Sequence, residues 1–142
     1  MSELLITLPV QPVACPRPRV TKFGTYYPKT YKKFMSASKA LISEDVIEFI
    51  DTHKQILKEG PLHIEYIFVF RRPKALQGRK HTDQRIPHIK RPDLDNLIKA
   101  INDLLQNTGL IKDDSLICSF AGSKFYADKT EGPSITVKIK RA

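Results

Sequence analysis

The stretch Leu62-His-Ile-Glu-Tyr-Ile-Phe-Val-Phe70 carries the strongest strand signal in the chain. It begins with apolar and polar residues in alternation and ends with apolar residues on both faces. This pattern is typical of a strand in the middle of a sheet, with neighbours along both edges. We therefore expect residues 62–70 to form the central strand around which the remaining elements assemble.

Two helices are predicted, one before and one after this strand in the sequence. Over residues 94–106 the apolar side chains form one continuous stripe at helical spacing, made by Leu94, Leu97, Ile98, Ile101, Leu104 and Leu105. Asn107-Thr108-Gly109 predicts the end of that helix. A longer helix is predicted over residues 29–57, because apolar residues recur there at roughly helical spacing and Gly60-Pro61 stops the pattern.

Three further strands are expected at residues 4–8, 115–126 and 134–140, which gives the order β-α-β-α-β-β. The order indicates an α/β (α+β) fold, with a small mixed sheet packed against two main helices. The length of 142 residues favours a single domain over residues 1–142. Residues 73–90 lack periodicity, and we expect a long, mobile loop there, which at this length is usually functional.

The composition, 41% hydrophobic and 27% charged, is that of an ordinary soluble globular protein. No apolar run approaches the roughly 18 residues that a membrane-spanning helix needs, and the N-terminus lacks the features of a secretion signal. Cys15 and Cys118 form no zinc-type spacing. No glycine-rich phosphate loop or nucleophile elbow occurs. We expect a cytoplasmic protein with no membrane association and no small-molecule cofactor.

The charge balance favours a polyanionic partner, for which nucleic acid, an anionic membrane surface and an acidic protein are all candidates; a basic surface that only confers solubility is the alternative. Lys and Arg number 24 against 15 acids, which gives a net charge of +9. The positive charge is concentrated in residues 16–33 and 71–91. From these two clusters we expect nucleic-acid contacts by Arg17, Arg19, Lys22, Arg71, Arg72, Lys90 and Arg91. The aromatic residues Phe23, Tyr26, Tyr27 and Tyr31 fit two interpretations, stacking on bases or packing in the core.

Acidic residues gather at the start of the helix predicted at residues 94–106. Asp93 and Asp95 lie at its N-terminus, and Asp113-Asp114 follows shortly after its end. One interpretation is structural: Asp93 caps the helix, Asp95 favours the positive end of its dipole, and Asp113-Asp114 is a solvated turn. The other is that these carboxylates converge, since Asp93 in extended backbone and Asp95 in the first turn can lean toward one point.

Converging carboxylates would bind a hard cation, because an all-oxygen ligand set without Cys suits Mg²⁺ or Mn²⁺. Such an ion inside a basic surface can polarise a phosphoryl oxygen and activate water, which is the chemistry of a phosphodiester hydrolase. Lys99 could then neutralise the charge that develops on the phosphate. Its alternative role is that of an i,i+4 partner of Asp95.

The stretch Asp93-Leu-Asp-Asn-Leu-Ile-Lys-Ala100, followed by Asp103, Leu104, Gly109 and Asp113-Asp114, resembles the RusA-type Holliday junction endodeoxyribonucleases. Pro12-Val-Ala-Cys-Pro-Arg-Pro-Arg19, Thr25-Tyr-Tyr-Pro-Lys29 and His88-Ile-Lys-Arg-Pro92 look similar to segments of the phage and prophage members. The resemblance extends over most of the chain, and the acidic block is its specific part.

The resemblance implies a homodimer that nicks four-way DNA junctions with Mg²⁺, in DNA recombination and repair. Carried over by position, Asp93, Asp95 and Asp114 are the expected metal-binding catalytic acids, and Lys99 is the expected catalytic lysine. Asp113 is also a candidate metal ligand, and the assignment between it and Asp114 stays open. An alternative function is a non-catalytic nucleic-acid-binding module in which the Asp residues are helix caps.

Overall fold

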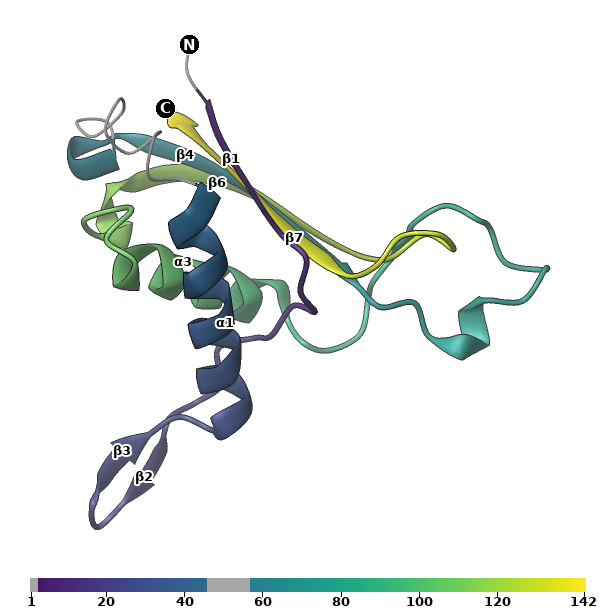
Figure 1. Ribbon diagram of the computed structural model, residues 1–142, viewed down its shortest axis with the longest axis horizontal. Coiled ribbons are helices and arrows are strands. Elements are labelled where there is room, and N and C mark those ends of the chain that lie inside the picture. The colour runs from purple at the N-terminus through teal and green to yellow at the C-terminus, as the bar shows by residue number, and fades with distance from the viewer. Residues whose placement is uncertain (1–2, 46–56) are drawn as a thin grey trace.

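The computed structural model describes residues 3–45 and 57–142, which form a mixed sheet with helices against one of its faces (Figure 1). The larger elements are β1 (Glu3–Leu8), α1 (Lys29–Asp45), β4 (Leu62–Phe70), α3 (Leu94–Asn107), β6 (Ile117–Tyr126) and β7 (Ser134–Arg141). The shorter ones are β2 (Arg19–Thr21), β3 (Gly24–Tyr26), η1 (Lys74–Leu76), β5 (Ile86–Pro87) and η2 (Asp114–Leu116). The predicted α+β class is confirmed.

The five-stranded sheet has the order β1-β7-β4-β6-β5, so β4 lies at its centre as predicted. It pairs antiparallel with β7 and parallel with β6. A parallel pair needs a crossover connection, and α3 lies in the connection from β4 to β6. The sheet therefore fixes where α3 can lie, and with it the acidic residues at the start of that helix.

The core lies between the sheet and the helices. Alternate residues of the strands are buried on the helix-covered face, among them Ile6, Tyr66, Phe68 and Val137. The apolar stripe of α3 packs onto this face through Leu97, Ile98, Ala100, Ile101, Leu104 and Leu105. At Gly122 of β6 the helix comes so close that an added Cβ would lie 2.9 Å from Ile98 Cδ1.

The end of α3 also follows the prediction. Gly109 adopts φ +75°, the left-handed region that glycine occupies without strain. The N–H of Leu110 donates to the carbonyl of Leu105 at 3.0 Å. The N–H of Gly109 donates to the carbonyl of Gln106, also at 3.0 Å. These two bonds end the helix and direct the chain back toward η2.

Two expectations need correction or restriction. Within the described residues α1 ends at Asp45, and the part of the predicted helix from 46 to 56 lies outside them. Where we expected only an extended segment near Pro16–Arg19, a hairpin of β2 and β3 projects from the body (Figure 1). Phe23 at its tip is 89% exposed. Among the described residues, no helix is both long and apolar enough to cross a membrane.

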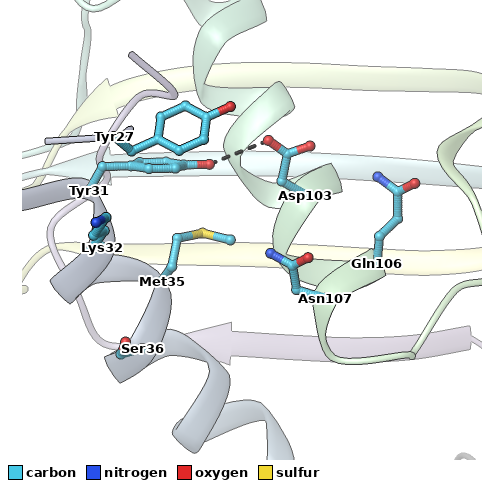
Figure 2. Close-up of a pocket in the computed structure, with 8 residues that line it drawn as sticks. All are labelled: Tyr27, Tyr31, Lys32, Met35, Ser36, Asp103, Gln106 and Asn107. Carbon is cyan, nitrogen blue, oxygen red and sulfur yellow. Dashed lines mark hydrogen bonds between the residues drawn. The ribbon is translucent and has the colours of Figure 1, made fainter. Parts of the chain in front are cut away.

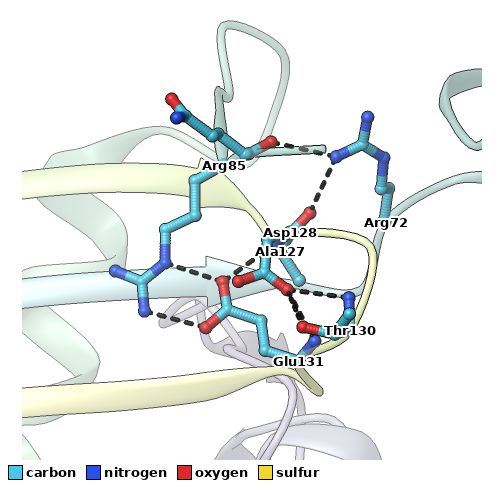
Figure 3. Close-up of polar contacts among 7 residues, drawn as sticks. Arg72, Arg85, Ala127, Asp128, Thr130 and Glu131 are labelled. Atoms are coloured by element: carbon cyan, nitrogen blue, oxygen red, sulfur yellow. Dashed lines mark hydrogen bonds and ion pairs between the residues drawn. The ribbon is translucent and has the colours of Figure 1, made fainter. Parts of the chain in front are cut away.

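The predicted loop at residues 73–90, here called the basic arm, is held by specific contacts and contains η1 and β5. The side chain of Arg72, 5% exposed, holds its base (Figure 3). Its guanidinium donates to the backbone carbonyls of Leu76 at 2.7 Å, Thr82 at 2.5 Å, Gln84 at 3.0 Å and Ala127 at 3.4 Å. One buried cation thus connects two parts of the arm to the end of β6.

Residues of the β6–β7 connection hold the other side of the arm. Lys129 Nζ donates to the carbonyls of Gly78 at 3.1 Å and His81 at 2.9 Å, and pairs with Asp83 at 3.0 Å. Arg85 forms a two-pronged ion pair with Glu131, with N–O distances of 2.7 and 2.9 Å (Figure 3). The arm is therefore an ordered extension of the sheet.

We predict that Arg72→Met lowers the free energy of unfolding by about 2–4 kcal/mol, because it removes four hydrogen bonds of a buried guanidinium and leaves the buried carbonyl of Ala127 without that donor. Chemical denaturation measures the change. Arg71→Met is the matched control, since that side chain is exposed and should change stability by less than about 0.5 kcal/mol. Equal effects of the two substitutions would contradict the role given to Arg72.

Candidate active site

The site is centred on the N-terminus and polar face of α3. Asp93 occupies the N-cap position with extended backbone, φ −71° and ψ 145°, but its side chain makes no capping hydrogen bond. Asp95, in the first turn, accepts from the N–H of Asn96 at 2.9 Å. Both side chains are exposed. The helix-cap interpretation of Asp93 requires a bond that the structure lacks, so its carboxylate stays available to a ligand.

Lys124 of β6 holds the segment that leads into Asp93. Its Nζ donates to the carbonyls of Lys90 at 2.5 Å and Pro92 at 2.7 Å. These carbonyls lie directly before the helix, so Lys124 fixes the approach of the chain to Asp93. The sequence analysis missed this residue, because only the folded sheet brings it under a segment more than 30 positions away.

His88 orders the same segment. Its ring is buried, 4.3 Å from the ring centroid of Tyr126 and 4.6 Å from that of Phe70. Its Nδ1 accepts the backbone N–H of Lys90 at 3.2 Å. Burial lowers the pKa of His88, and the positive charges of Lys124 and Lys90 lower it further. The neutral ring is thus the form that the fold selects.

The two adjacent acids after α3 lie in different environments. Asp113 caps η2, with Oδ1 accepting the N–H of Ser115 at 2.8 Å, and hydrogen bonds from Ser115 lower its pKa. Reduced hydration raises the pKa of Asp114, as does the neighbouring carboxyl of Asp113. Asp113 thus has a structural partner, whereas Asp114 is a carboxylate whose charge is poorly compensated.

The polar face of α3 lies beside Asp114. Asp103 contributes to raising the pKa of Asp114, and Lys99 opposes it, so both charges act on this carboxyl. The backbone N–H of Asp114 donates to Gln106 Oε1 at 3.1 Å. Lys99 and Asp95 form no ion pair in the described part of the chain. The i,i+4 interpretation of Lys99 therefore has no contact to support it.

Behind this face, a buried tyrosine holds the helix to the sheet. Tyr66 of β4 donates its hydroxyl to Asn102 Oδ1. Burial raises the pKa of Tyr66, and the charge of Asp114 adds to the shift. Neither Tyr66 nor Asn102 was singled out from the sequence, because each reads there as part of a strand or helix pattern.

In the part of the chain that the structure describes, the carboxylates do not form a metal-ligand set. Over residues 3–45 and 57–142, no group of three or more His, Cys, Asp or Glu side chains is placed to hold a metal ion. The donors themselves suit a hard divalent cation, being carboxylate oxygens without sulfur. The raised pKa of Asp114 has the same implication, since a nearby cation would stabilise its ionised form.

The basic residues expected to contact nucleic acid differ in availability. The side chains of five are exposed, namely Arg17, Lys22, Arg71, Lys90 and Arg91. The side chain of Arg72 is buried and donates to four backbone carbonyls, so its hydrogen bonds serve the basic arm. Arg19 belongs to β2, and its side chain lies outside the described part of the structure.

We predict that stability falls as the pH is lowered from 7.5 to 5.5, in part through His88. The pKa of His88 is lower in the folded chain than its ordinary value of about 6.5, so the unfolded chain binds the proton first. The contribution of the neutral His88 ring to folding stability is therefore present at higher pH and is lost as the pH falls. Urea denaturation of His88→Asn should show a smaller pH dependence than the parent protein or the control His81→Asn. An unchanged dependence in His88→Asn would refute the assignment.

Comparison with known proteins places the chain in a family. A search of curated proteins finds no match to the chain. The profile of the family described as Endodeoxyribonuclease RusA matches residues 9–140, from the segment before the hairpin to the last strand. The match includes α3, η2, Lys124 and the basic arm. The chain therefore belongs to the RusA endodeoxyribonuclease family.

Proposed function

We propose that this protein is a Mg²⁺-dependent, structure-selective endodeoxyribonuclease that resolves four-way DNA junctions by paired symmetric nicks. The observation that carries the proposal is the free carboxylate of Asp93 at the start of α3. Its carboxylate is exposed at a helix N-cap and makes no capping bond, in a protein with a net charge of +9. Membership of the RusA family supplies the nuclease class.

Asp93, Asp95 and Asp114 are the residues that we propose to hold the metal ion, with Asp113 as their neighbour. A bound Mg²⁺, or Mn²⁺ in its place, would supply Lewis-acid polarisation of the phosphate and a more acidic water. Asp113 is the weaker candidate as a ligand, because Oδ1 already accepts the N–H of Ser115. Asp114 gains most from a cation, since reduced hydration and the neighbouring Asp113 raise its pKa in the chain alone.

The other residues of the site bind and orient the substrate. Lys99 is exposed on the polar face of α3 and would neutralise charge on the phosphate that is cut. Lys124 and His88 hold the segment before Asp93, so that its carboxylate is positioned before DNA binds. The exposed side chains of Arg17, Lys22, Arg71, Lys90 and Arg91 would contact the DNA backbone.

We further propose that the chain acts as a single RusA-like domain over residues 1–142 and as a homodimer. Two symmetric cuts across a four-way junction require two active sites related by a two-fold axis. A dimer supplies both sites with one kind of chain.

The direct test is Asp93→Asn. We expect Mg²⁺-dependent cleavage of a four-way junction to fall more than about 100-fold, because removal even of an outer partner of a metal ligand costs 10–100-fold. Junction binding should be unchanged or tighter, since a negative charge is lost. Gel-based cleavage and equilibrium binding measure the two quantities.

The control for this substitution is Asp83→Asn in the basic arm, an exposed acid outside the site, which should retain cleavage. Cleavage that survives in Asp93→Asn would remove Asp93 from the mechanism. A parent protein that binds junctions and cuts none with Mg²⁺ or Mn²⁺ would instead be a non-catalytic DNA-binding module.

A second test concerns salt. If Lys90 and Arg91 each neutralise one phosphate, replacing both with Ala should reduce the slope of log affinity against log salt by about 2, at about 0.9 per contact on duplex DNA. Lys140→Ala lies outside both basic clusters and should leave the slope unchanged. Titrations from low to moderate salt measure the slopes. A slope that is equal in all three proteins would contradict backbone contacts by Lys90 and Arg91.

A further inference from the structure

A cavity of about 640 Å³ opens between α1 and α3, next to the candidate active site (Figure 2). Tyr27, Tyr31 and Lys32 line it from the α1 side, and Asp103, Gln106 and Asn107 line it from α3. Its volume falls in the range of pockets that hold a small organic group. Nothing in the proposed cleavage step uses this cavity.

The cavity shares a wall with the site through Gln106. Its Oε1 accepts the backbone N–H of Asp114 at 3.1 Å, while the residue also lines the cavity. Asp103, on the same helix, acts on the charge of Asp114 and lies one turn beyond Lys99. Four residues of helix rise about 6 Å. A nucleotide whose phosphate lies at Lys99 could therefore place its base in the cavity.

The aromatic side chains form an apolar wall. The rings of Tyr27 and Tyr31 lie 5.2 Å apart at an angle of 49°. Tyr31 is buried and fixed, with its hydroxyl donating to Asp103 Oδ2 at 3.4 Å, whereas Tyr27 is only half-buried. A fixed ring behind a more accessible one provides a surface on which a flat aromatic group can stack.

Facing that wall are groups that form hydrogen bonds in the plane of such a ring. The amide of Asn107 offers donors and an acceptor, and the carboxylate of Asp103 is an acceptor (Figure 2). The amide of Gln106 accepts the N–H of Asp114 and donates to the carbonyl of Asn102 at 3.3 Å, which leaves its second N–H for a ligand. Lys32 is exposed at the mouth of the cavity and can contact a phosphate. An aromatic wall, amide and carboxylate edges and a cation at the rim together match a nucleotide.

We propose that this cavity receives one unpaired base of the DNA, turned out of its stack beside the phosphate that is cut. Tyr27 stacks on the base, and Asn107 and Gln106 contact its edge. The proposal rests on the proposed function, and it makes selection of a branched substrate depend on a base that leaves its pair readily. Bases at the branch point of an opened junction are such bases, because each terminal pair there has a stacking neighbour on one side only.

The test measures binding without cleavage, in EDTA, on four-way junctions. Each nucleotide within three of the branch point is replaced in turn by an abasic residue. We expect Tyr27→Ala to weaken binding of the intact junction about tenfold. At one abasic position the same substitution should have no effect, because the base that it contacts is absent. Asn107→Ala, an exposed second variant, should show a smaller loss that vanishes at the same position.

Tyr26→Ala is the matched control, since that ring is exposed and does not line the cavity. Any effect of Tyr26→Ala on binding should be the same for intact and abasic junctions. The proposal is overturned if Tyr27→Ala weakens binding equally at every abasic position, or if it matches Tyr26→Ala throughout. Because the readout is binding, a protein that never cleaves yet shows the coupling would contradict the nuclease function and support the base pocket.

Discussion

The packing of α3 on β6 is the constraint on which the site depends. Gly122 has no side chain, and the helix lies so close at this point that a Cβ would come within 2.9 Å of Ile98. The buried stripe of α3 faces the sheet, so the opposite face must carry Asp95 and Lys99 outward. The direction of the polar side chains thus follows from apolar packing, without any contact among the polar groups themselves.

Asp113 and Asp114 are adjacent in the sequence, but their carboxylates lie in different environments. The first satisfies the N–H of Ser115 and is stabilised as an anion. The second has its backbone N–H held by Gln106, while its carboxylate lies among the charges of Asp103 and Lys99. One acid therefore shapes the turn, and the other is kept in an environment where a cation would be favourable.

The elements that the sequence predicts well are those with a local signal. The central strand at residues 62–70 has the predicted bounds, and α3 differs by one residue, because periodicity and a terminal glycine lie within the segment itself. The order within the basic arm could not be predicted, since Arg72 binds a carbonyl of Ala127, 55 positions away. For the same reason Lys124 escaped notice. The sequence pattern identifies the acids, but the different environments of Asp113 and Asp114 can be seen only in the folded structure.

The way Arg72 and Lys129 hold the basic arm has a consequence for association with DNA. A loop that becomes ordered only on binding gives up conformational entropy at that moment, and the loss subtracts from the affinity. Here the order is established when the chain folds, since both cations bind backbone carbonyls of the arm. The exposed Lys74 and Lys80 therefore stay at a set distance from the sheet, so the arm acts as a spacer of fixed length and not as a flexible tether.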